Sequence, residues 1–267
     1  MTGKRSDGVR GSSWRRGQGW GFVVGNIILR PTFLLSSTHT WIDGEKIPRE
    51  GGCILVVNHL SHLDPLVIAH FVYDQHRLPR YLAKAALFRS NRFVAGVLRS
   101  TRQIPVERLT THAVSAYDAA VAAVRAGDCV VVYPEGTLTR DPDLWPMRGK
   151  TGAARIALAT GAPVIPIAHW GAQELLPPYS TRPRPWPRKH LTVKVGDPVA
   201  LEDLRARAEQ PGVVQEATDR IMTALVRVLE EVRGEKAPTD RFDPAKAGVR
   251  LIGNPHPHEP RKKKRKT

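Results

Sequence analysis

Apolar and polar positions divide the chain into short apolar runs, typical of strands, and longer amphipathic segments, typical of helices. The apolar runs predict strands over residues 38–42, 53–58, 81–84, 104–106, 128–133, 163–168 and 191–195. The amphipathic segments predict a helix from residue 64 onward and helices over residues 87–98, 111–126, 151–160, 201–208 and 213–232. This alternation predicts an α/β fold with a central, mostly parallel or mixed sheet flanked by helices.

Several helix ends carry recognisable signals. Asp64 followed by Pro65 is a combination of N-cap and first helical residue, so the first helix of the domain is expected to begin there. Gly127 and Gly161 are placed to end the helices that precede them. We find no internal repeat and no linker within residues 37–235, which predicts one domain. An N-terminal segment, residues 1–36, precedes it, and a disordered basic tail, residues 236–267, follows.

Residues 1–36 combine basic side chains with a short apolar run. That run, residues 20–29, contains two glycines and an asparagine, whereas a membrane-spanning helix needs about 20 apolar residues. Neither a transmembrane helix nor a signal-peptide cleavage site is predicted, which favours a cytoplasmic protein. Basic residues beside Trp, Phe and Leu are typical of an amphipathic segment that lies on a membrane surface. A first helix that simply packs on the core is the alternative interpretation.

The positive charge is concentrated at the two ends of the chain. Of the formal net charge of +16 over 267 residues, residues 1–30 contribute +5 and residues 261–266 contribute +6. Such ends suit an anionic membrane surface or a nucleic acid. Between them we find no stripe of interleaved aromatic and basic residues, so a nucleic-acid partner is not expected. A hydrophobic share of 41% excludes a wholly disordered chain, and two cysteines exclude a disulfide framework.

The densest group of chemically active side chains is residues 58–64, directly after a predicted strand. A turn could bring the carboxylate of Asp64 onto one imidazole nitrogen of His59 and leave the other nitrogen to act as a general base. In the alternative interpretation, Asp64 only caps a helix. A metal site from His59, Asp64 and His62 lacks a fourth ligand. Ser61 as a nucleophile lacks the glycine-flanked turn of hydrolases.

Further candidate residues follow other predicted strands. Glu135, Gly136 and Thr137 come directly after the strand over residues 128–133, with Arg140 beyond them, and this group suits a polar head group. Lys84 and Arg108 each stand at or just past a strand end, where a cation could hold a phosphate. Gly149-Lys150-Thr151 is not a P-loop, because Leu144 occupies the position of the required glycine.

In this order and spacing, the segments resemble the lysophosphatidic acid (1-acylglycerol-3-phosphate) acyltransferase family. The Asn-His-x-Ser-x-x-Asp block of the family is similar to residues 58–64, its Ile-Pro-Val-x-Arg block to residues 104–108, and its Phe-Pro-Glu-Gly-Thr block to residues 133–137. An apolar strand block is similar to residues 163–167, and an Ala-Lys pair to residues 83–84. Together these blocks cover about residues 53 to 170.

The resemblance implies an α/β acyltransferase domain over residues 37–235, held peripherally at the cytoplasmic face of the membrane by the segment before it. It implies transfer of a fatty acyl group from acyl-CoA or acyl carrier protein to the free hydroxyl of a lysophospholipid, without metal or organic cofactor and without a covalent acyl-enzyme. His59 would be the general base and Asp64 its orienting partner. The acceptor would be held by Lys84, Arg108, Glu135, Gly136, Thr137 and, in place of a missing family arginine, Arg140.

Two departures from the family pattern concern the acceptor site. Many members carry an arginine directly after the Gly-Thr pair of the third block, where this chain has Leu138. Many also have a glycine shortly before the second block, where Arg102 and Gln103 stand here. The identity of the acceptor head group therefore stays open at this point.

Overall fold

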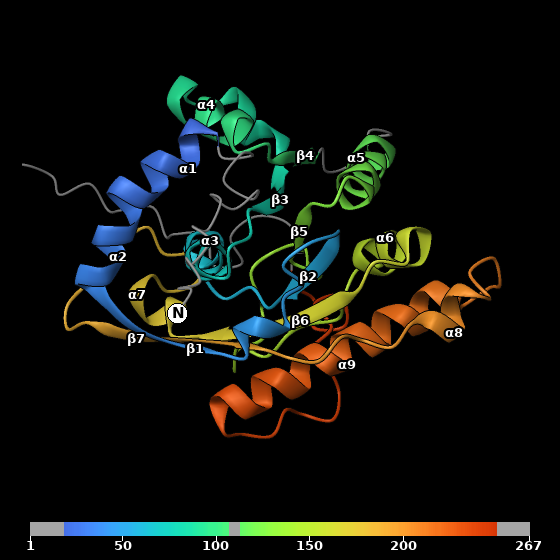
Figure 1. The fold of residues 1–267 in the computed structure, drawn as a ribbon. Coiled ribbons are helices and arrows are strands. Elements are labelled where there is room, and N and C mark those ends of the chain that lie inside the picture. Colours follow the sequence, from blue (N-terminus) through green and yellow to red (C-terminus); the bar gives the residue numbers. More distant parts are fainter. Residues whose placement is uncertain (1–18, 107–112, 250–267) are drawn as a thin grey trace, which may run out of the picture.

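A single seven-stranded sheet forms the centre of the computed structural model, which describes residues 19–106 and 113–249 (Figure 1). Its strands are β1 (Ser37–Ile42), β2 (Cys53–Val57), β3 (Pro79–Lys84), β4 (Ile104–Val106), β5 (Cys129–Val132), β6 (Val164–Trp170) and β7 (Lys189–Val195). The strand order is β1-β7-β6-β2-β5-β3-β4, and neighbours are parallel except for β6 and β7. The predicted α/β fold with a mixed sheet is confirmed.

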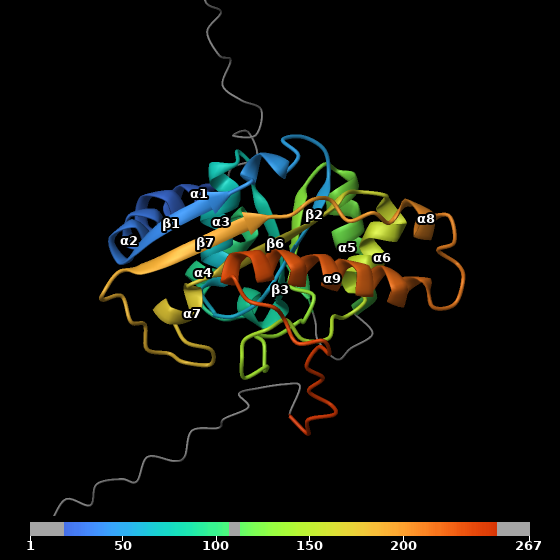
Figure 2. The same ribbon diagram turned by 90° about the horizontal axis from the view of Figure 1, so that it is seen from below.

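Helices cover both faces of this sheet. One face carries α3 (Asp64–Asp74) and α7 (Ala172–Leu175); the other carries α5 (Ala113–Arg125), α6 (Gly152–Thr160), α8 (Glu202–Arg205) and α9 (Val213–Arg233). Figure 2 shows α9 running along the sheet beside β6. Short 3-10 helices, η3 (Gly44–Lys46) and η4 (Ala85–Arg89), and α4 (Arg92–Ser100) complete the domain.

The strand β2 lies inside the sheet and has helices on both faces, so its side chains are apolar on both sides. Ile54 and Val56 point into the core under α5, α6 and α9, whereas Cys53, Leu55 and Val57 point into the core under α3 and α7. All five side chains are buried. A strand with helices on both faces reads as an unbroken hydrophobic run, and that run was the basis of the prediction.

The described part of the N-terminal segment, residues 19–36, is helical and packs on α4. It consists of α1 (Trp20–Val24), a π-helical stretch η2 (Gly25–Leu29) and α2 (Arg30–Ser36). The ring centroids of Trp20 and Phe93 are 6.1 Å apart, and the backbone amide of Gly21 donates to the Ser100 hydroxyl at 3.0 Å. Within the described ranges, no helix combines the length and the apolar character that crossing a membrane requires.

The structure corrects several predicted elements. The helix expected over residues 87–98 is split into η4 and α4, because the Asn91 side chain accepts the Phe93 amide and starts a new helix. Leu63 is the N-cap of α3, and Asp64 is its first helical residue. Residues 236–249, expected to be disordered, run back along the domain, and the Phe242 carbonyl accepts the Arg148 amide at 3.2 Å. Residues 1–18, 107–112 and 250–267, with the basic 261–266 run, lie outside the described residues.

Gly171 marks a close approach of two backbones, where β6 ends beside β7. Its φ is +102°, and a Cβ atom there would lie 2.0 Å from the carbonyl oxygen of His190. Gly212, before α9, has a φ of +86° with open space around a Cβ position. Both positions favour glycine by conformation, but only Gly171 is also enclosed.

We expect Gly171→Ala to be clearly more destabilising than Gly212→Ala. Backbone strain alone should lower the free energy of unfolding by about 1 to 2 kcal/mol in each variant. In Gly171→Ala the contact with the β7 backbone adds to this strain, since a backbone carbonyl cannot move aside without disturbing the strand pair. Urea denaturation of both variants measures the difference, and equal losses would contradict the packing argument.

Candidate active site

The loops that follow β2 and β5 and the end of β6 meet at one edge of the sheet. These three strands are neighbours and run parallel, so their carboxyl ends lie together, where open α/β sheets place their ligands. His59 and Asp64 come from the loop after β2 and the start of α3, Glu135 from the loop after β5, and His169 from β6. The site is therefore assembled from segments more than 100 residues apart in the sequence.

Asp64 is the fully buried centre of this arrangement. Its Oδ2 atom accepts the backbone amides of Leu60 at 2.6 Å and Ser61 at 2.8 Å, which fold the loop into a tight turn. The same oxygen lies 2.9 Å from Nδ1 of His59 and 3.5 Å from Nε2 of His169. A single carboxylate oxygen thus holds the loop and two imidazole rings.

The charged form of Asp64 is favoured despite its burial. Burial by itself would raise the pKa of this carboxyl, but the charge and hydrogen bond of His169, and then those of His59, outweigh it. Together they hold the pKa of Asp64 well below its usual range. The side chain is therefore an anion throughout the neutral range, which is what an orienting partner of a general base requires.

His59 is held in place on two sides and left open on a third. Asp64 bonds its Nδ1, and the ring of Tyr133 stacks on it with centroids 4.2 Å apart. Its side chain retains 16% exposure, whereas that of Asp64 has none. With Nδ1 engaged, Nε2 is the nitrogen left to take a proton, so the geometry is that of an oriented general base.

Glu135 connects the His59 loop to the segment that contains Met147. Its Oε1 accepts the His59 amide at 3.3 Å and its Oε2 accepts the Met147 amide at 3.0 Å. Burial raises the pKa of Glu135 to about 8, although both backbone hydrogen bonds act in the opposite direction. The sequence predicts a contact of Glu135 with the acceptor head group; in the structure its carboxyl group accepts backbone amides of the His59 loop and of Met147.

The other predicted acceptor residues are spread along the same edge. Lys84 is exposed at the end of β3, which β5 separates from β2. Gly136 forms the turn after β5 with a φ of +69°, and Thr137 is hydrogen-bonded to Tyr179. Arg140 is buried, with its guanidinium carbon 5.8 Å from the centroid of the Tyr179 ring. The predicted Arg108 lies outside the described residues.

Two residues of the site were not predicted with their observed roles. His169 is fully buried; its backbone amide and carbonyl bond the Asn58 side chain, and its Nε2 lies 3.0 Å from the Asn58 carbonyl oxygen. Its place at the end of the strand predicted over residues 163–168 was the available signal. Ser61 is also buried, and its hydroxyl donates to the Leu176 carbonyl at 2.7 Å, which is a structural role and not that of a nucleophile.

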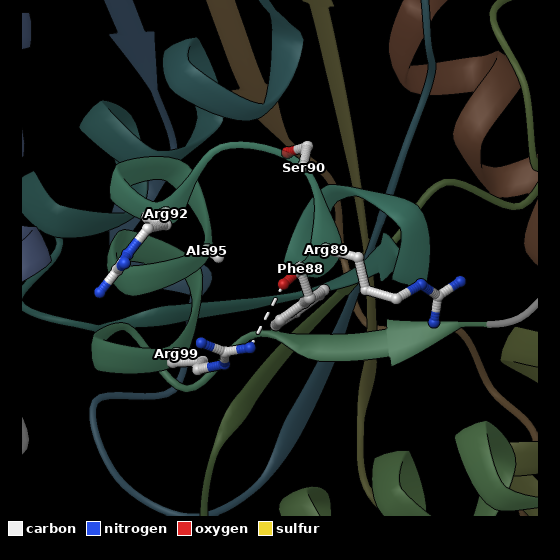
Figure 3. A pocket seen from close by; sticks show the side chains of 6 residues that line it. All are labelled: Phe88, Arg89, Ser90, Arg92, Ala95 and Arg99. Carbon is white, nitrogen blue, oxygen red and sulfur yellow. Dashed lines mark hydrogen bonds between the residues drawn. The ribbon is translucent and has the colours of Figure 1, made fainter.

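In the described part of the chain, no group of three His, Cys, Asp or Glu side chains is arranged to hold a metal ion. A hollow of about 460 Å³ lies between η4 and α4 (Figure 3), and it is lined by Phe88, Arg89, Ser90, Arg92, Ala95 and Arg99. Arg99 crosses it to donate to the Phe88 carbonyl, while Arg89 and Arg92 point away on opposite sides. None of these residues belongs to the His59 site.

A sequence model of the acyltransferase family matches residues 40–170, the stretch that contains His59, Asp64, Glu135 and His169. This stretch is an acyltransferase domain. The chain is 29% identical over 148 residues to a 1-acyl-sn-glycerol-3-phosphate acyltransferase of Borreliella burgdorferi, over 55% of this chain and 57% of that protein. It is 30% identical over 161 residues to an N-acylphosphatidylethanolamine synthase of Arabidopsis thaliana, over 56% of each. The chain thus spans about half the length of these curated relatives.

The fold of the acyltransferase domain also matches a solved structure. The crystal structure of the 1-acyl-sn-glycerophosphate acyltransferase PlsC from Thermotoga maritima aligns with a TM-score of 0.58, at 24% identity, over 82% of this chain and 81% of that one. The predicted resemblance to the lysophosphatidic acid acyltransferase family is confirmed. At this identity the structural match shows the fold, and it does not identify the substrate.

We expect Asp64→Asn to lower the free energy of unfolding at pH 6 by about 3 kcal/mol, because two imidazoles and two amides lose a buried anion. The folded pKa of Asp64 is depressed, so its stabilising effect is complete above the ordinary pKa, near 4, and is lost as the pH falls below it. Urea denaturation at pH 6 and pH 3.5 should show a smaller difference from the wild type at the lower pH. Asp118→Asn, on an exposed face of α5, is the control.

Glu135→Gln should change the pH dependence of stability in the opposite sense. Because the folded pKa is raised to about 8, the wild type loses stability as the pH rises from about 4.5 to 8, by at most about 1.4 kcal/mol per pH unit. Glutamine has no proton to release, so the stability of the variant relative to the wild type should increase across this window. Parallel curves from pH 5 to 8 would contradict the raised pKa.

Proposed function

We propose that the acyltransferase domain transfers a fatty acyl group from a thioester donor to the free hydroxyl of 1-acyl-sn-glycerol-3-phosphate, forming phosphatidic acid. The observation that carries this proposal is the imidazole of His59, bonded through Nδ1 to a buried, charged Asp64 and partly exposed on its other side. The family of the domain and the names of its relatives support it.

The residues supply proton transfer and orientation. Nε2 of His59 takes the proton of the acceptor hydroxyl, and Asp64 stabilises the imidazolium that forms. The hydroxyl oxygen attacks the thioester carbonyl carbon, a carbon–oxygen bond forms, and the carbon–sulfur bond breaks. His59 then gives its proton to the departing thiolate, which leaves as a free thiol. The acyl group passes directly to the acceptor without a covalent acyl-enzyme.

We assign the acceptor phosphate to Lys84 and Arg108, with Gly136 and Thr137 beside it. Lys84 supports this assignment because it is an exposed cation at the same edge of the sheet as His59. Arg140 is proposed to replace the arginine that many family members carry at the position of Leu138. The side chain of Leu138 is only 2% exposed here and offers no charge to a head group.

We further propose that the protein works peripherally at the cytoplasmic face of an anionic membrane, with acyl-CoA or acyl carrier protein as donor. The N-terminal helices and α4 present a set of exposed apolar side chains: Trp20, Val23, Ile27, Ile28, Leu34, Leu35, Phe93 and Val94. Ile27 is 69% and Leu35 77% exposed. An apolar helical face beside a basic segment suits monotopic attachment to anionic lipid.

A second acceptor is favoured by two observations. Leu138 departs from the family pattern at the head-group side of the site, and one relative is named for the synthesis of N-acylphosphatidylethanolamine. The same base could deprotonate a different lysolipid hydroxyl, since His59 contacts the reacting oxygen and not the head group. Other lysolipids and glycerol phosphate therefore belong in the acceptor panel.

The test is acyl transfer from acyl-CoA and from acyl carrier protein to 1-acyl-sn-glycerol-3-phosphate in mixed micelles. The assay measures the release of free thiol and the formation of phosphatidic acid. His59→Ala should lower kcat/KM by at least about 100-fold, the usual contribution of a general base. His62→Ala, on the exposed side of the same loop, is the matched control and should stay near the wild type.

The outcomes separate the acceptor from the chemistry. Wild-type activity only with another lysolipid, still lost in His59→Ala, would change the acceptor and keep the mechanism. No transfer to any acceptor of the panel with either donor would overturn the proposed function. Full activity of His59→Ala would overturn the role of His59.

A further inference from the structure

The connection between α7 and β7, residues 176–188, carries the most exposed apolar side chain of the described residues. We call it the Trp186 loop. The indole of Trp186 is 79% exposed and stands between Pro185 and Pro187. A single exposed apolar side chain is ordinary, so the surroundings of this one decide what it means.

Those surroundings are strongly basic. From residue 176 to residue 190 the sequence has no acidic residue and four cations: Arg182, Arg184, Arg188 and Lys189. Arg182 and Arg184 are exposed on the loop itself. An indole among cations matches the boundary between lipid head groups and acyl chains, where the ring enters the apolar layer and the cations meet phosphates.

The loop is also tied to the N-terminal helices. One guanidinium nitrogen of Arg188 donates to the carbonyl oxygens of Leu34 and Ser37, both at 2.7 Å. Leu34 is 41% and Leu35 77% exposed at this end of α2. Figures 1 and 2 both show the α7–β7 connection at the same end of the molecule as α2. Arg188 therefore ties the Trp186 loop to the end of α2 at which Leu34 and Leu35 are exposed.

The other end of the loop reaches the active site. The carbonyl of Leu176 accepts the hydroxyl of Ser61, in the catalytic loop, at 2.7 Å. The hydroxyl of Tyr179 donates to the Leu138 carbonyl at 3.0 Å, and its ring lies under Arg140. One short segment thus contacts the loop that contains Ser61, the residue directly after the third sequence block and the end of α2.

We propose that the Trp186 loop is a second bilayer contact, separate from the N-terminal helices. The indole of Trp186 enters the boundary of an anionic membrane, and Arg182 and Arg184 bind lipid phosphates. Because the loop is bonded to the Ser61 and Leu138 segments, this contact sets the active site against the membrane surface. The inference rests on the proposed function in one respect: that function requires a substrate that lies in a bilayer.

The first experiment measures binding of the full chain to phosphatidylcholine vesicles with and without 30% phosphatidylglycerol. We expect Trp186→Ser to weaken binding by about tenfold, because the variant loses the burial of roughly a quarter of an indole surface in the membrane. Arg182→Gln/Arg184→Gln should weaken binding to the anionic vesicles by roughly 25-fold, about fivefold for each cation. Arg155→Gln/Arg227→Gln, with the same loss of charge on exposed positions of α6 and α9, is the matched control and should change binding less than threefold.

A second readout reports where the indole lies. Vesicles made with brominated lipid quench tryptophans that enter the acyl layer, so quenching should fall in Trp186→Phe, which keeps an apolar ring. Unchanged vesicle affinity in Trp186→Ser together with unchanged quenching in Trp186→Phe would overturn the proposal. So would a loss of affinity in the Arg182/Arg184 variant no larger than in its control.

Activity separates this proposal from the proposed function and from a protein partner. Trp186→Ser should lower transfer to an acceptor embedded in vesicles more than transfer to a short-chain acceptor below its micelle concentration. A wild type that binds vesicles through Trp186 but transfers nothing would refute the proposed function alone. Normal vesicle binding with a defect only toward acyl carrier protein would identify an acidic protein as the partner and overturn the bilayer contact.

Discussion

The buried carboxylate of Asp64 is the interaction on which the rest of the site depends. An isolated anion without any exposure would be expensive to bury, so the surrounding segments must supply donors. They come from three places: the turn amides of Leu60 and Ser61, the ring of His59, and the ring of His169 at the end of β6. The need to pair one charge therefore determines the shape of the loop after β2 and its contact with β6.

A second buried carboxyl, that of Glu135, meets the same constraint in a different way. It has backbone amides but no cation among its described contacts, and burial raises its pKa, whereas the two histidines beside Asp64 lower the pKa of that group. The charged Asp64 lies 2.9 Å from Nδ1 of His59 and is placed to stabilise a positive charge on that ring. Glu135 instead bonds the backbone of His59 and that of Met147, so it fixes the position of the His59 loop and not the charge of its ring.

Local patterns in the sequence were sufficient for the elements but not for their long-range contacts. The unbroken apolar run of β2 and the glycines after α5 and α6 predicted strands and helix ends close to those observed. The pairing of His59 with Asp64 could be proposed because both lie within one turn. The contact of His169 with Asp64 could not, since it depends on β6 lying beside β2 across more than 100 residues. The break between η4 and α4 was missed because the polar run of residues 89–92, which contains the helix cap Asn91, was taken as the polar side of one continuous helix.

The same dependence on distant contacts explains why the surface that we propose to face a membrane could be predicted only in part. The N-terminal apolar run is visible in the sequence, but a proline-rich, basic segment around Trp186 reads as an ordinary surface loop. Its position becomes informative only when Arg188 is seen to bond the end of α2 and Ser61 to bond Leu176. The proposed acceptor lies in a bilayer, so the proposed base has to be aligned with the plane of the head groups. The loop is bonded at one end to Ser61, beside His59, and at the other to the exposed end of α2, and these short, direct contacts are the reason why we propose that it sets that alignment.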